Sequence, residues 1–174
     1  MNMFKTDSFV VYPAQGVGVI ERIDSREIGG AVCDLYVVRI RANDVILMVP
    51  VQNAAAVGLR SLSSREEALS IMEFLRTDLE KQIATGQNWN RRFREYTERL
   101  KSAELRVVAE VLRELLLIGR AKELSFGERR LLEQAYMLVG GELAEVLDTT
   151  IEAIRSELLS LYPPYAPPDD KKSS

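Results

Sequence analysis

The chain has 174 residues, of which 47% are hydrophobic and 28% charged, a composition typical of a globular protein and not of a disordered one. No apolar run approaches the roughly 18 residues that cross a bilayer, the first residues lack the pattern of a signal peptide, and one cysteine forms no internal disulfide, so we expect a cytoplasmic protein. The formal net charge of −3 excludes a protein that holds nucleic acid tightly through its overall charge.

The charge is unevenly distributed along the chain. Residues 1–62 carry six Lys or Arg and six Asp or Glu, whereas residues 131–174 carry three basic and eight acidic residues. Residues 88–130 carry eleven basic and seven acidic residues, so the positive surplus is local and begins beside Trp89, the single tryptophan.

The first 62 residues alternate short β-rich runs with turn residues. Gly29 and Gly30 separate two β-branched runs, which predicts a hairpin because primed turns need positive φ. Four or five short strands in about 60 residues bury too little as an open sheet, so a small, strongly bent barrel of SH3 or Tudor type is expected. The predicted strands lie at 9–12, 17–28, 31–41 and 45–50.

From Ser64 onward the apolar spacing is that of helices. Helical runs are predicted over 64–76, from 89 onward, over 103–119, 126–147 and 151–162, and Gly119 is placed to end the third. The expected N-caps are Ser64, Asn88, Ser102, Ser125 and Thr149.

The predicted fold class is therefore α+β. It comprises a Tudor-like or SH3-like β barrel over residues 1–62, an all-α bundle over residues 63–162 and a tail over residues 163–174. The tail holds four of the six prolines and has no apolar periodicity, so we expect it to be disordered.

The residue types that most enzymes need are missing from the sequence. The chain has no histidine, and its single cysteine cannot make a zinc site. No phosphate-binding loop or nucleophile elbow is present, and most carboxylates fall on helix faces. We expect no enzyme activity, no cofactor and no metal, which leaves a protein that works by binding.

Trp89 begins a stripe of apolar residues. Trp89, Phe93, Tyr96 and Leu100 are spaced by 4, 3 and 4 residues and share one face of a helix. This spacing alone favours a core residue. Its place in the first turn, which overhangs the helix end, instead favours an exposed ring that contacts a partner.

Arginines surround that stripe. Arg92 and Arg99 flank it on one side, Arg94 and Lys101 lie further round on the other, and Arg91 points away. Aromatic rings between guanidiniums suit the edge of a nucleic acid duplex, where a ring unstacks a base step and guanidiniums hold phosphates. Arg129 and Arg130 form a second basic pair in the first turns of a later helix, where backbone N–H groups also favour phosphate, although a solvated helix face explains this pair equally well.

Four stretches follow one another along the chain: DSFVVYPAQGVGVIERI, VPVQNAAAVGLR, NWNRRFREYTERL and LSFGERRLLEQAYMLVGGELA. In this order they resemble the CarD/CdnL family of bacterial transcription regulators over about residues 3–160. The first is shared with the polymerase-binding module of transcription-repair coupling factors, so the specificity comes from all four together.

The resemblance implies a Tudor-like domain that binds the β subunit of RNA polymerase and a helical domain that binds promoter DNA. It places a minor-groove wedge at Trp89, at the upstream edge of the promoter bubble. Arg91, Arg92, Arg94, Arg129 and Arg130 would be its phosphate neighbours. It also places Arg26 where family members carry an arginine that touches the β subunit, and Met48 where some members carry a basic residue.

There are three alternatives at this point. The first is an adaptor that binds polymerase, or another partner, without touching DNA, and the second is an RNA-associated factor. The third is a free-standing coupling-factor module, which would not explain about 100 helical residues with their own basic patch. The neutral charge of residues 1–62, without a row of aromatic residues, is unfavourable to the second. The sequence gives no strong signal for a dimer, so a monomer associated with the nucleoid through polymerase is expected.

Overall fold

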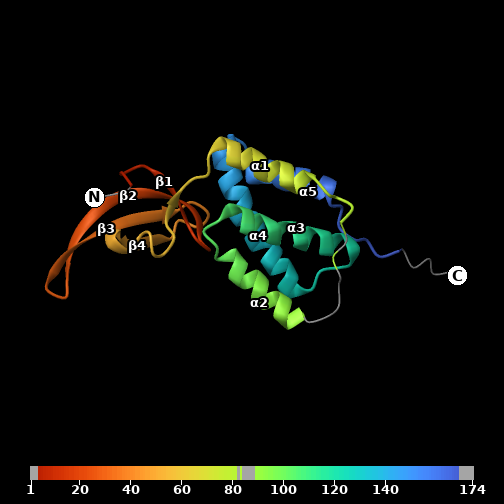
Figure 1. Cartoon of the computed structure of the whole chain (residues 1–174), viewed down its shortest axis with the longest axis horizontal. Helices are drawn as coiled ribbons and strands as arrows, with labels where there is room; N and C mark the ends of the chain where they lie inside the picture. The colour runs from red at the N-terminus through yellow and green to blue at the C-terminus, as the bar shows by residue number, and fades with distance from the viewer. Residues whose placement is uncertain (1–3, 82, 84–88, 169–174) are drawn as a thin grey trace.

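The structure is a computed structural model that describes residues 4–81, 83 and 89–168. A β-sheet and a group of helices lie end to end along the long axis of the molecule (Figure 1). The elements are β1 (Phe9–Tyr12), β2 (Gly16–Ile28), β3 (Ala31–Ile40), β4 (Ile46–Pro50), η1 (Val51–Asn53), β5 (Arg60–Ser61), α1 (Arg65–Arg76), α2 (Trp89–Leu100), α3 (Leu105–Ala121), α4 (Phe126–Leu147) and α5 (Ile151–Leu161).

The five strands form one antiparallel sheet in the order β4-β3-β2-β1-β5. Gly29 and Gly30 make the β2–β3 turn with φ of 61° and 82°, which confirms the predicted hairpin. The register shifts between Ile20 and Arg22, and a bulge of this kind bends a strand and increases its twist. The inner face of the bent sheet buries the apolar core of this half, which includes Val10, Ile20, Tyr36, Val38 and Ile40.

The helical half is built around α3, whose apolar side chains are buried against the other helices. Figure 1 shows α1 and α5 side by side, and α2 on the opposite side of α3 and α4. Side chains cap the helices as the sequence predicts at Ser64, whose Oγ accepts from the Glu67 N–H at 3.0 Å, and at Ser125, which forms a full capping box with Glu128. The predicted α+β class, with strands first and helices second, is confirmed.

The predicted cap of α5 is wrong by one residue. Asp148 ends α4 in the left-handed region with φ 55°, and the Thr149 N–H donates to the Ala144 carbonyl at 3.0 Å. Thr149 therefore closes α4, and Thr150 caps α5 by accepting from the Ala153 N–H at 3.0 Å.

The predicted limits of α3 are also wrong. The helix begins at Leu105, and the Ser102 Oγ accepts from the Glu104 N–H at 3.1 Å. It continues past Gly119, where a Cβ would lie 3.2 Å from Leu124 Cδ1, so glycine serves close packing here and not helix termination. Asn88, the expected cap of α2, lies outside the described residues.

Residues 163–168 continue the chain beyond α5 without helix or strand, and the Tyr165 N–H donates to the Gly119 carbonyl at 2.9 Å. The last six residues of the expected disordered tail lie outside the described part. Among the helices that the structure describes, none combines the length and apolar character of a membrane span.

Candidate nucleic-acid interface

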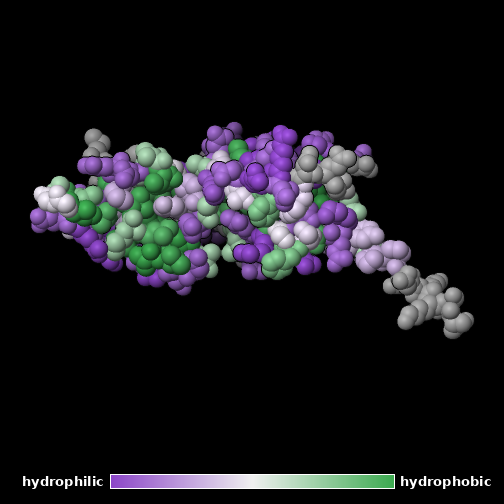
Figure 2. Space-filling model, turned by 90° about the horizontal axis from the view of Figure 1, so that it is seen from below, coloured by the Kyte–Doolittle hydropathy of each residue, from purple (hydrophilic) through white to green (hydrophobic). Residues whose placement is uncertain are grey.

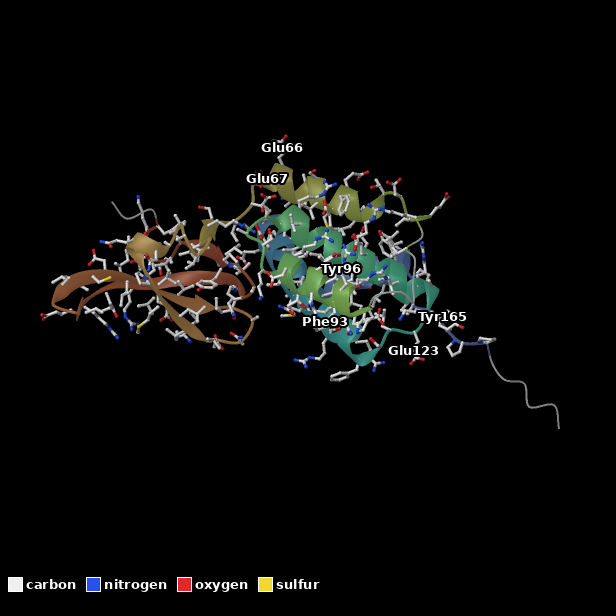
Figure 3. The ribbon with its side chains drawn as sticks, turned by 60° about the horizontal axis from the view of Figure 1, so that its bottom comes forward. Glu66, Glu67, Phe93, Tyr96, Glu123 and Tyr165 are labelled. Carbon is white, nitrogen blue, oxygen red and sulfur yellow. The ribbon has the colours of Figure 1, made fainter. Side chains whose placement is uncertain are left out.

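The aromatic stripe of α2 is buried at one end and exposed at the other. Tyr96 and Leu100 are 2% and 1% exposed and belong to the helical core. Phe93 is 38% exposed, and Trp89 is half-buried with its ring 5.6 Å from the Phe93 ring, edge to face. Figure 3 shows Tyr96 among the helices and Phe93 toward the lower edge of the helical half. The predicted stripe thus changes from core to surface within three turns.

The first turn of α4 lies against the exposed end of this stripe. A Cβ on Gly127 would lie 3.5 Å from Trp89 Cζ2 and 3.7 Å from Phe93 Cε2. The preceding residue, Phe126, is 69% exposed, and the guanidinium of Arg130 lies 5.8 Å from the centre of its ring. Phe126 was not predicted as a site residue from the sequence. A large apolar residue directly after the capping Ser125 is the signal that could have found it.

Several arginines of α2 and α4 have no carboxylate partner among the residues that the structure describes. Arg91 pairs with Glu95 at 3.2 Å and faces along its own helix. In the described part of the chain, four of the arginines expected to contact phosphate form no ion pair: Arg92, Arg94, Arg129 and Arg130. Unpaired guanidiniums keep their charge available to a phosphate backbone.

We call Trp89, Phe93, Phe126, Arg92 and Arg130 the aromatic–basic edge, which is built from two helices that are separated by α3 in the chain. Arg129 lies on the other side of α4, where it lines a pocket with Leu124 and Tyr165. The structure leaves Arg91, paired with Glu95, out of the group, and Arg94 is exposed further round α2.

The N-terminus of α4 is partly satisfied by the chain itself. The Glu128 carboxylate accepts from the Ser125 N–H at 2.9 Å and from the Lys122 ammonium at 2.8 Å, and Ser125 Oγ accepts from the Glu128 N–H at 3.2 Å. Burial raises the pKa of Glu128, but these hydrogen bonds outweigh it and hold the pKa below its usual range. The N–H groups of Ser125 and Glu128 are thus already bonded at this turn, and Arg129 and Arg130 supply its positive side-chain charge.

The electrostatics of α2 also separate a buried from an exposed side. Burial raises the pKa of Tyr96, and so does its hydrogen bond with Glu114, whereas the charges of Arg92 and Arg99 lower it. Arg99 is neutralised by Glu110 at 2.8 Å and Glu114 at 3.5 Å. The buried end of α2 is therefore charge-balanced, and the surplus stays at the Trp89 end.

The residues expected to touch polymerase share one face of the sheet. Met48 lies opposite Val37 on the edge strand β4, and Arg26 lies opposite Cys33 on the exposed β2–β3 hairpin. Cross-strand partners face the same side, and the register places both pairs on the outer face. Met48 is 43% exposed and its neighbour Ile46 39%. Figure 2 shows hydrophobic surface gathered over the sheet half on the side seen from below.

Within the residues that the structure describes, no group of side chains could hold a metal ion. The arrangement offers two surfaces for binding, one apolar on the sheet and one aromatic and basic on the helices. Fold and site together define a two-domain binding protein.

Comparisons with known proteins identify its family. Residues 4–63 match the CarD-like/TRCF RID domain, and residues 70–159 match the CarD C-terminal domain. The chain is 26% identical over 154 residues, which span 88% of this chain and 99% of the relative, to a protein of Bacillus subtilis (strain 168) named "Putative transcription factor YdeB". The chain belongs to the CarD family: it is a transcription factor with an RNA polymerase-interacting domain, and not an enzyme.

Proposed function

We propose that the protein binds the β subunit of RNA polymerase through its N-terminal sheet and stabilises promoter open complexes. In this proposal, Trp89 enters the minor groove at the upstream edge of the bubble and slows the collapse of the bubble. Arg92 and Arg130 contact phosphates beside it, with Arg91, Arg94 and Arg129 further out, without reading base sequence.

The aromatic–basic edge is the observation that carries this proposal. A partly exposed indole braced by Phe93 is a rigid apolar wedge, and wedges of this kind unstack base steps at a cost of a few kcal/mol. Arginines that form no ion pair within the described ranges are placed to recover that cost through phosphate contacts. Phe126 extends the same apolar surface across to α4.

Weak binding to DNA is sufficient if polymerase holds the protein at the promoter. The net charge of −3 leaves only a local positive patch, so affinity for free DNA should be low and should fall steeply with salt. A domain tethered to polymerase meets promoter DNA at an effective concentration that reaches roughly millimolar. Specificity then comes from polymerase and from the shape of the fork.

One observation favours an adaptor that does not contact DNA. Trp89 packs partly against the helical core, as a purely structural tryptophan would. The two functions differ in what the loss of the ring does to DNA, because an adaptor keeps its activity as long as the domain stays folded.

The test is the lifetime of open complexes formed with purified polymerase, at two salt concentrations. We expect the natural protein to lengthen the lifetime and Trp89→Ala to bind polymerase normally without lengthening it. Tyr165→Ala is the matched control, since it removes an aromatic ring that is 43% exposed at a distance from α2 (Figure 3). A folded Trp89→Ala variant that lengthens the lifetime as well as the natural protein would leave the adaptor as the better account.

A further inference from the structure

A buried ion pair joins the two halves of the molecule. Arg60 on β5 donates to both carboxylate oxygens of Glu142 on α4, at 2.8 Å and 2.7 Å. Ser63, between β5 and α1, donates to the same carboxylate from its N–H at 2.9 Å and its hydroxyl at 2.5 Å. Glu142 is 1% exposed, and its Oε2 accepts three of these hydrogen bonds while its Oε1 accepts one.

We call Arg60 and Glu142 the junction pair. Arg60 also donates from Nε to the carbonyl of Ala103, in the connection between α2 and α3. One guanidinium on the sheet therefore binds both α4 and the connection that follows α2. The helices α2 and α4 are the two elements that form the aromatic–basic edge.

The charge and the bidentate hydrogen bonding of the junction pair favour one orientation of Arg60 relative to Glu142. Burial raises the pKa of Glu142, but the hydrogen bonds from Arg60 and Ser63 outweigh it and hold the pKa below its usual range. The carboxylate therefore stays charged at neutral pH. A bidentate pair fixes both distance and angle, and a buried charge that loses its partner is costly, so the junction has one favoured geometry.

The second ion pair between the halves is different. Arg41 and Glu145 are 3.4 Å apart, with side chains 54% and 28% exposed. A monodentate, hydrated pair of this kind contributes little and restricts orientation weakly. Glu142 and Glu145 both lie on α4, and of these two carboxylates Glu142 restricts the orientation of the halves more strongly.

α4 connects the junction pair to the proposed wedge, so a rotation at one end of the helix displaces the other end. Figure 1 shows it running from the sheet side of the helical half toward the side where α2 begins. Gly127 precedes Glu142 by 15 residues, which at 1.5 Å per residue is about 22 Å, so a rotation of about 10° at the junction moves the first turn of α4 by about 4 Å. That displacement exceeds the stacking distance between bases.

We propose that Arg60 and Glu142 are positioning residues, which fix the aromatic–basic edge relative to the polymerase-binding sheet without touching DNA or polymerase. This proposal rests on the proposed function of Trp89. Loss of the pair should leave the sheet able to bind polymerase and the helical half able to bind fork DNA. When both are bound at once, however, Trp89 should no longer reach the correct base step.

The experiment compares Glu142→Gln with Glu145→Gln in the full chain. The two substitutions remove the same charge from the same helix at the same junction, one at a buried carboxylate and one at a half-buried carboxylate. Spin labels at Gln52→Cys on the sheet half and Glu123→Cys at the far end of the helical half, in a Cys33→Ser background, report the distribution of distances between the halves. Open-complex lifetime, polymerase binding and fork-DNA binding are measured on the same proteins without labels.

We expect Glu142→Gln to broaden the distance distribution and to keep both separate binding reactions within about twofold. The factor by which Glu142→Gln lengthens the open-complex lifetime should be about fivefold or more smaller than that of the natural protein. Fivefold is the lower end of the usual range of coupling between two sites. Glu145→Gln should match the natural protein in every readout. Ser63→Ala, which removes one hydrogen bond and no charge, should give the same pattern more weakly and covers the case in which Glu142→Gln fails to fold.

Two results would overturn the proposal. One is a distance distribution as narrow as that of the natural protein in both junction variants, and the other is a broadened distribution with an unchanged lifetime. Failure of the proposed function is recognised separately, because Trp89→Ala would then lengthen the lifetime normally. In that case the positioning role falls with it, while the distance distributions still show whether the junction pair locks the two halves.

Discussion

The sheet and the helical half both expose apolar side chains, and the charge around those side chains differs. On the sheet, Met48 and Ile46 lie in a segment with equal numbers of basic and acidic residues. On the helices, Phe93 and Phe126 lie beside arginines that have no carboxylate partner in the described part of the chain. A neutral apolar face suits a protein surface, and an apolar edge set in positive charge suits nucleic acid. Neighbouring charge therefore indicates the class of partner better than exposed apolar area does.

The largest expected effect tests this comparison through salt. Replacing Arg92, Arg129 and Arg130 with alanine should weaken binding to fork DNA and reduce the slope of log K against log salt by about 0.9 for each arginine that contacts a phosphate. Fluorescence anisotropy over a salt series measures the slope. Arg26→Ala on the sheet is the control, and it should leave the slope unchanged. An equal loss of slope in Arg26→Ala would contradict the assignment of the two surfaces.

A matched pair of glycine substitutions compares packing in the two regions. A Cβ at Gly18 in β2 would lie 2.7 Å from Val38 Cγ1 and 3.0 Å from the Arg39 carbonyl, so Gly18→Ala should lower the free energy of unfolding by about 1–3 kcal/mol. At Gly127 the added methyl meets Trp89 and Phe93 at ordinary contact distances, and alanine favours the helix by up to about 1 kcal/mol. Urea titration measures both. A larger loss at Gly127 would mean that Trp89 packs on α4 differently.

The smallest expected effect comes from two buried hydroxyls. The Tyr36 hydroxyl accepts from the Phe4 N–H at 3.1 Å, so Tyr36→Phe should cost about 1 kcal/mol. The Tyr136 hydroxyl is buried without a partner among the described residues, and burial raises the pKa of Tyr136 to about 12. Tyr136→Phe should therefore be neutral or stabilising in thermal unfolding. Equal costs at the two positions would contradict this difference between the halves.

Local patterns were sufficient to predict the elements. Gly29 and Gly30 predict the hairpin, and Ser125 with Glu128 predicts the capping box, because each depends on residues close in the chain. The errors arose where a neighbouring element competed for the same residue. Thr149 closes α4 and so cannot cap α5, and Gly119 accommodates Leu124 inside α3.

The site could be predicted only in part, because its geometry depends on long-range contacts. The spacing from Trp89 to Leu100 predicts the aromatic stripe, but it does not decide whether Trp89 lies in the core or at the surface. The close approach of Gly127 to the Trp89 ring brings together residues 38 positions apart, and the junction pair joins residues 82 positions apart. Spacing along one helix carries no information on either contact.

The most direct test of the account places a fluorescent base, 2-aminopurine, at the upstream edge of the bubble in promoter DNA. Its emission reports unstacking when a ring enters the step beside it. We predict that the natural protein changes this emission in open complexes, and that Trp89→Ala, bound to polymerase equally well, does not. A probe at the downstream edge should respond to neither. The same upstream change with both proteins would show that the ring of Trp89 does not enter the DNA, and would contradict the central claim.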